Sequence, residues 1–282
     1  MSPHIAPETH VGRVALRVND LDRVVEFYSD VVGLAVLTES ETAATLGAGG
    51  RPFLELTTAP DLPERGRTET GLFHTAFRVP TREALGDALH RVENQWRLSG
   101  ASDHLVSEAL YLNDPEGNGI EIYTDRPRET WERDEDGELL MDTLPLDLGE
   151  LRELGDTDST VPDGTDVGHI HLEVSSIPAT REFYEDAVGL DSPVALPAPY
   201  GGSSLFVSAG GYHHHIGANT WNGRTDPPSG RGLDWFELVV PDEAALAAVR
   251  DQFDTAGVDV AEADGELHVH DPNGIELRIR TE

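Results

Sequence analysis

An internal repeat constrains the fold of this chain more than any other feature of its sequence. Residues 13–18 return as residues 169–174, and residues 33–34 return as residues 189–190, with the same shift of 156 positions. A repeat of this length indicates duplicated structural units, and missing it would misassign the whole fold. The 282 residues therefore consist of two duplicated halves.

A second repeat lies within each half. Residues 71–80 of the first half match residues 232–241 of the second, and both also resemble the first stretch of their own half. Each of these two stretches leads on to a turn that begins with Asp-Pro, at Asp114 and at Asp271. The chain is thus predicted to contain four copies of one small module.

Periodicity predicts the structure of each module. Short apolar stretches rich in β-branched residues predict a strand at the start of each copy. In the first copy, apolar residues then recur every three or four positions between Asp20, a suitable N-cap, and Gly33, a suitable helix stop. Ser176 is the corresponding cap in the third copy, and helices are expected over residues 81–92 and 242–253. Short strands close each copy, so we expect an α+β fold with the order βαβββ four times.

The segment between the halves differs in composition. Residues 129–166 contain fourteen acidic residues, with only Arg133 and Arg152 as bases. Such a composition is typical of a solvated linker. We therefore predict a first domain at 8–127, an acidic linker at 128–166 and a second domain at 167–282.

Charge and cysteine content exclude several classes of protein. The net charge is −33, from 53 acidic residues and 20 basic residues that are all arginine, so nucleic acid is excluded as a partner. Acidic residues spread over the whole chain indicate a halophilic protein. No apolar run is long enough to cross a membrane, and the start of the chain shows no secretory signal, so a cytoplasmic location is expected. Without cysteine, any metal must be bound by histidine and carboxylate groups.

Equivalent strand positions predict candidate metal ligands. The first strands of the four modules place four residues at one position: Arg13, His74, His169 and Trp235. The final strands offer another four: Glu55, Glu121, His215 and Glu276. Two histidines and one glutamate form a ligand set that binds a divalent metal and leaves coordination positions open.

These motifs resemble the vicinal oxygen chelate superfamily, which contains glyoxalases, fosfomycin and bleomycin resistance proteins and extradiol dioxygenases. The resemblance covers both halves and implies four βαβββ modules in curved mixed sheets. Residues 100–115 and 212–221 narrow the resemblance to catechol 2,3-dioxygenases of the Bacillus type. It implies an oxidoreductase of aromatic hydrocarbon catabolism, with Fe(II) as cofactor, that uses O2 to open the ring of catechol or a substituted catechol.

The resemblance also implies how modules share a metal. One module supplies a histidine from its first strand, and its partner supplies a histidine and a glutamate. Modules two and three give a complete set of His74, Glu121 and His169, whereas other pairings present Arg13 or Trp235 in a ligand position. The fallback is a site in the second half made by His169, His215 and Glu276.

Three consecutive histidines are candidates for proton transfer. If residues 213–215 lie on a strand, His213 and His215 share a face and His214 points away. The resemblance implies a catalytic histidine on this strand, and His215 is our first choice and His213 the second. His171 shares a face with His169, and His104 lies in the segment that narrows the resemblance.

Two other classes of function use the same fold. A glyoxalase-like isomerase or a resistance-type transferase would use Mn(II), Ni(II) or Zn(II), and a binding protein would hold an aromatic ligand without metal. The expected partners of the dioxygenase are a small aromatic diol and O2, with a homo-oligomer as a further option.

Overall fold

Four modules follow one another along the chain in the computed structural model, which describes residues 4–156, 160–195 and 202–282. The first module comprises β1 (His10–Val18), α1 (Leu21–Phe27), η1 (Tyr28–Val32), β2 (Ala35–Glu39), β3 (Ala43–Ala48) and β4 (Arg51–Thr58). The second comprises β5 (Gly71–Arg78), α2 (Arg82–Gln95), β6 (Gly100–Asp103), β7 (Ser107–Asn113) and β8 (Gly119–Asp125).

The second half repeats this order after the linker. The linker contains η2 (Arg128–Thr130), β9 (Leu139–Leu140) and α3 (Leu148–Leu154). The third module comprises β10 (Asp166–Glu173), α4 (Ile177–Arg181), η3 (Glu182–Ala187), β11 (Val194–Ala195), β12 (Ser204–Val207) and β13 (Ile216–Asn219). The fourth comprises β14 (Gly232–Val240), α5 (Glu243–Ala256), β15 (Ala261–Ala263), β16 (Glu266–His270) and β17 (Glu276–Thr281). The predicted order of elements is confirmed, although β11 pairs with β9 of the linker.

The predicted helix ends are confirmed in the first and third modules, at α1 and α4. The Asp20 side chain accepts a hydrogen bond from the backbone N–H of Arg23, and the Ser176 hydroxyl accepts one from Ala179. After α1 the helix continues as the π-helical turn η1 and ends at Gly33, whose φ of +92° is a left-handed conformation that glycine adopts without strain.

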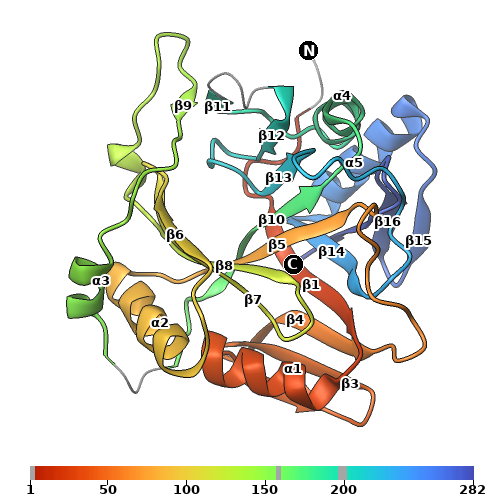
Figure 1. The fold of residues 1–282 in the computed structure, drawn as a ribbon. Coiled ribbons are helices and arrows are strands. Elements are labelled where there is room, and N and C mark those ends of the chain that lie inside the picture. Colours follow the sequence, from red (N-terminus) through yellow and green to blue (C-terminus); the bar gives the residue numbers. More distant parts are fainter. Residues whose placement is uncertain (1–3, 157–159, 196–201) are drawn as a thin grey trace.

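The two sheets do not follow the two halves of the sequence. The eight-stranded sheet has the order β15-β16-β17-β14-β1-β4-β3-β2 and combines modules one and four. The seven-stranded sheet has the order β12-β13-β10-β5-β8-β7-β6 and combines modules two and three. Antiparallel pairs β1–β14 and β5–β10 join the halves (Figure 1). The division into 8–127 and 167–282 thus describes the repeat in the sequence, whereas each sheet needs strands from both halves.

The linker is more structured than its composition suggests. Helix α3 lies beside α2 (Figure 1), buries Leu151 completely and joins α2 through the ion pairs Arg82–Glu150 and Arg152–Glu93. Earlier in the linker, the side chains of Trp131 and Leu139 are buried as well. The expectation of a fully solvated linker is wrong here, because leucine and tryptophan spaced among the acids provide enough apolar surface to pack.

One hydrophobic core connects all four modules. It includes Val14, Leu85, Leu172 and Phe253, one from each module, and all four are fully buried. Burial of this kind stabilises a side chain by about 1.5–3 kcal/mol relative to exposure. The common core fixes the two sheets to each other and so holds the residues on their faces in place.

The described residues include no helix long and apolar enough to cross a membrane.

The high negative charge leads to a prediction about salt. With a net charge of −33, carboxylates repel one another in the folded state, and this repulsion acts over about 10 Å at 0.1 M salt but only about 3 Å at 1 M. We therefore expect the thermal unfolding midpoint to rise from 0.1 M to molar KCl by about 2–4 °C for each kcal/mol of stability gained.

Calorimetry over this range of salt tests the prediction. Salt also weakens ion pairs such as Arg82–Glu150, so the two effects oppose each other and the net charge decides the sign. A midpoint that does not change with salt would contradict halophilic adaptation.

Candidate metal centre

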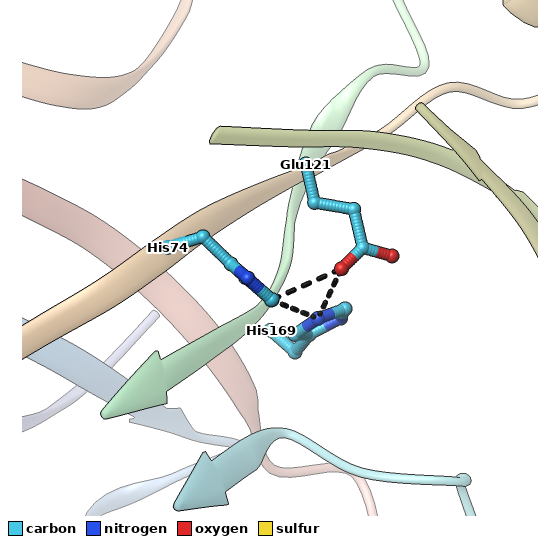
Figure 2. Close-up of side chains that lie close together, drawn as sticks. All are labelled: His74, Glu121 and His169. Atoms are coloured by element: carbon cyan, nitrogen blue, oxygen red, sulfur yellow. Dashed lines mark hydrogen bonds and ion pairs between the residues drawn. The ribbon is translucent and has the colours of Figure 1, made fainter. Parts of the chain in front are cut away.

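Pairing of three strands brings the predicted ligands of modules two and three together. Ala76 of β5 is directly opposite Glu121 of the parallel strand β8 and opposite His169 of the antiparallel strand β10. His74 lies two positions before Ala76 on the same face, because side chains alternate along a strand. The three side chains therefore point toward one another from three adjacent strands (Figure 2).

Short distances separate the three ligand atoms. Nε2 of His74 lies 3.0 Å from Oε2 of Glu121, and Nε2 of His169 lies 3.3 Å from the same oxygen. The two Nε2 atoms are 3.3 Å apart. His74, Glu121 and His169 are 6 %, 3 % and 2 % exposed, so all three polar groups lie in the protein interior. A buried carboxylate and two imidazoles this close need a shared cation or proton.

The electrostatic state of this cluster suits a metal ion. Burial lowers the pKa of His169 to about 4, so its imidazole is neutral at pH 7. Burial alone would raise the pKa of Glu121, but its interactions with His169 and His74 outweigh burial and hold this pKa well below its usual range. Metals bind neutral imidazole and ionised carboxylate, so His169 and Glu121 are already in the forms that bind.

The spacing of the ligand atoms also fits a metal. Histidine and carboxylate ligands lie roughly 2.0–2.2 Å from a divalent transition metal, so edges of 3.0–3.3 Å correspond to ligand angles of about 90–105°. Angles of this size belong to three ligands on one face of a metal, the arrangement of the two-histidine, one-carboxylate iron sites. Within the described part of the chain, the Nδ1 atom of His169 has no hydrogen-bond partner.

The fallback ligands do not meet. His169 lies on the seven-stranded sheet, whereas Glu276 lies on the eight-stranded sheet, where its carboxylate contacts His268 at 3.3 Å and Arg278 at 2.8 Å. His215 precedes β13, and its Nδ1 accepts the backbone N–H of Ala209 at 3.2 Å. The structure therefore supports the first ligand set and gives no site made by His169, His215 and Glu276.

Ion pairs occupy the corresponding positions of modules one and four. Arg13 contacts Glu55 at 2.7 Å and also pairs with the fully buried Glu237. The Trp235 ring lies beneath two guanidinium groups, with Arg278 at 4.0 Å and Arg13 at 5.3 Å from its centre. An arginine thus replaces the expected histidine and carries the positive charge that the carboxylates need.

The expectation that His213, His214 and His215 lie on a strand is wrong. Strand β13 begins only at Ile216, and the histidines follow a turn at Gly210 and Gly211, both with positive φ. Alternation of side chains therefore does not apply to them.

The rings of His213, His214 and His215 each contact different neighbours. His214 packs its ring against His169 with a centroid distance of 4.1 Å, and burial holds its pKa well below the usual range. His213 binds Asp125, and His215 stacks on Tyr212 at 4.9 Å. Of the three, His214 makes the closest ring contact with the candidate ligands.

A tyrosine that the sequence analysis did not select also lies at the centre. Tyr111 of β7 is the cross-strand neighbour of Glu121, and its ring is 5.8 Å from that of His74. Its hydroxyl lies 2.7 Å from Nε2 of His104, while Nδ1 of His104 lies 2.7 Å from the carbonyl of Asp142. Because a carbonyl only accepts, Nδ1 donates to it, which leaves Nε2 as the nitrogen that pairs with the Tyr111 hydroxyl. The position of Tyr111 within residues 100–115 was the only signal for it in the sequence.

Aromatic and imidazole rings surround the three ligands. The centre of the Phe73 ring lies 5.3 Å from that of His74 and 5.1 Å from that of His171. The ring centres of Trp221 and His171 are 5.7 Å apart. His171 points its Nε2 to the Asn219 amide, 3.0 Å away, so it supports the site from β10. Phe206 adds a ring 4.7 Å from His214. Rings of this kind provide apolar contacts for an aromatic ligand.

The fold and the centre together define a class of protein. Repeated βαβββ modules that gather two histidines and a glutamate on one sheet are the features of the vicinal oxygen chelate proteins. The model of the Glyoxalase/Bleomycin resistance protein/Dioxygenase superfamily matches residues 10–122, and the chain belongs to this superfamily.

Particular relatives narrow the class. The chain is 44 % identical over 278 residues to catechol-2,3-dioxygenase of Bacillus subtilis (strain 168), a match that covers 95 % of each chain. It is 31 % identical over 161 residues to biphenyl-2,3-diol 1,2-dioxygenase 3 of Rhodococcus globerulus, covering 51 % of this chain and 83 % of that one. The crystal structure of glyoxalase I from Zea mays shares the fold, with a TM-score of 0.59 at 15 % identity over 96 % of this chain and 92 % of that one.

Proposed function

We propose that this protein is an iron(II)-dependent extradiol dioxygenase that cleaves catechol or a substituted catechol. The buried cluster of His74, Glu121 and His169 carries the proposal, because it provides the ligand set that such an enzyme needs. The 44 % identity to a catechol-2,3-dioxygenase over 95 % of the chain supports the same reaction.

His74, Glu121 and His169 would hold the iron. Three protein ligands leave other coordination positions free for exogenous molecules. Iron(II) held by these residues would supply the redox chemistry between the diol and O2. The side chains supply the buried, water-excluding surroundings in which this chemistry takes place.

His214 is the side chain we assign to proton transfer. Its ring contacts that of His169 and is buried, and a neutral imidazole beside the substrate can take a proton from a catechol hydroxyl and return it later. Tyr111 of β7 and His104, which directly follows β6, form a hydrogen-bonded pair, and Tyr111 is the cross-strand neighbour of Glu121. Phe73 and Phe206 would contact the apolar part of the ring.

Charge also favours this substrate class. A protein with a net charge of −33 repels anions before they reach the site. Catechol is uncharged at neutral pH, so it approaches without this penalty. We expect carboxylated catechols to show higher KM values at low salt than uncharged ones.

Reconstitution with different metals tests the proposed function. The protein is incubated anaerobically with Fe(II), Mn(II), Ni(II) or Zn(II) at molar KCl, then mixed with catechol and air-saturated buffer. We expect Fe(II) to give O2 consumption and a yellow ring-opened product in equal amounts. No O2 consumption with any metal, together with isomerase activity on a hemithioacetal in the presence of Ni(II) or Zn(II), would instead indicate a glyoxalase-like enzyme.

A further inference from the structure

A chain of hydrogen bonds runs from Asp125 to the ring that contacts His169. Nε2 of His213 lies 2.9 Å from Oδ1 of Asp125, at the end of β8. Nδ1 of His213 lies 2.7 Å from Nδ1 of His214, whose ring in turn packs on His169. His213 is fully buried and lies under the Trp131 ring, 5.4 Å away.

The carboxylate fixes the direction of each hydrogen bond in this chain. An ionised carboxylate only accepts, so Nε2 of His213 must carry a proton. With that proton on Nε2, the other nitrogen of the His213 ring, Nδ1, is left to accept from Nδ1 of His214, 2.7 Å away. His214 is consequently held with a proton on Nδ1 and none on Nε2.

Several groups keep Asp125 ionised and in place. The Tyr212 hydroxyl donates to the carboxylate at 3.1 Å, and the Arg78 guanidinium lies 3.3 Å from it. The hydroxyl of Tyr123 lies 2.7 Å from that of Tyr212, and this hydrogen bond helps to hold the Tyr212 hydroxyl in place. Burial alone would raise the pKa of Asp125, but its bonds to His213 and its proximity to Arg78 lower it. These contacts favour the ionised carboxylate, which accepts the hydrogen bond at this end of the chain.

We propose that Asp125 and His213 are positioning residues that hold His214 in the tautomer with an unprotonated Nε2, which is then able to accept a proton. This inference rests on the proposed function, in which His214 is the acid and base. When Nε2 takes the proton of a catechol hydroxyl, the O–H bond breaks and an N–H bond forms. The positive charge that appears on His214 is stabilised through His213 by the Asp125 carboxylate, and return of the proton restores the starting state.

Imidazole nitrogen NMR of the metal-free protein tests the tautomers directly. The ¹⁵N shifts and their couplings to ring protons distinguish protonated from bare nitrogens. We expect His213 to be protonated on Nε2 and His214 on Nδ1. A wild-type spectrum with the His214 proton on Nε2 would overturn the proposal, whether or not any variant folds.

Asp125→Asn tests the consequence for turnover. An amide can donate to Nε2 of His213, which reverses every hydrogen bond in the chain and moves the His214 proton to Nε2. We expect kcat to fall by roughly 10–10³-fold with little change in KM or iron content, in line with the worth of a correctly poised acid–base group. Asp125→Glu keeps the carboxylate and should recover much of the loss.

Asp166→Asn is the matched control. Asp166 binds the same guanidinium as Asp125, with Nη2 of Arg78 2.7 Å from Oδ2, but none of its contacts with the described residues involves a histidine. It should leave both the tautomers and kcat unchanged. Equal losses in the two variants, or an unchanged kcat in Asp125→Asn, would contradict the proposal. If the wild type cleaves no catechol, the proposed function fails, whereas the NMR result still decides the tautomer.

Discussion

Replacing Glu121 with alanine is expected to abolish iron binding and ring cleavage together. Glu121 is the only carboxylate of the cluster and contacts both imidazoles, at 3.0 and 3.3 Å. Its loss removes one of three ligands and the only negative charge among them. Removing a residue that only hydrogen-bonds to a metal ligand lowers metal affinity by about 10–100-fold. Removing the ligand itself should therefore weaken binding by more than about 10²-fold. Metal analysis after gel filtration measures it.

The same result is expected for His74→Ala and His169→Ala. Glu276→Ala is the matched control, since Glu276 is a partly buried glutamate on the other sheet that contacts His268 and Arg278. This control should keep full iron content. Loss of iron in Glu276→Ala with retention in His74→Ala would place the metal in the second half, and circular dichroism would show that each variant is folded.

His214→Phe is expected to lower kcat by ~10²–10⁴-fold while iron remains bound, the usual effect of removing a positioned acid–base group. Phenylalanine preserves a ring between His169 and Phe206, where the His214 ring now lies 4.1 and 4.7 Å from its neighbours. The variant therefore removes proton transfer with little change in packing. Steady-state kinetics with catechol, normalised to iron content, measures the effect.

His215→Phe provides the comparison, because the sequence favoured His215 for this role. His215 stacks on Tyr212 and binds the backbone of Ala209, so its replacement should lower stability more than turnover per bound iron. A large loss of kcat in His215→Phe with normal turnover in His214→Phe would restore the prediction made from the sequence. Equal turnover in all three proteins would remove both histidines from proton transfer.

Local patterns predicted the elements well. Asp20, Ser176 and Gly33 mark helix ends in the structure because capping and left-handed turns depend only on neighbouring backbone groups. The ligand set of His74, Glu121 and His169 was also predicted before the structure. The repeat places equivalent residues at equivalent strand positions, and the resemblance implies how two modules share a metal. These three residues then meet because Ala76 pairs with both neighbouring strands.

Features that depend on distant contacts were not predictable. Strand alternation misassigned residues 213–215, because a glycine turn and side-chain hydrogen bonds decide where their rings point. Tyr111 became visible only through its pairing with Glu121 across the sheet. The packing of the linker depends on α2, which offers Gly86 where the backbone of α3 approaches closely. Composition reports none of these contacts.

The pairing of module one with four and of module two with three has a consequence for the origin of the chain. A protein with only two modules could form the same two sheets by pairing with a second copy of itself. The first module of each copy would then pair with the second module of the other. Such a dimer has two-fold symmetry and two identical centres, each shared between the chains. Fusion of the copies into one chain removes that symmetry, so each centre can change separately. One has His74, Glu121 and His169, and the other is closed by Arg13 with Glu55 and Glu237.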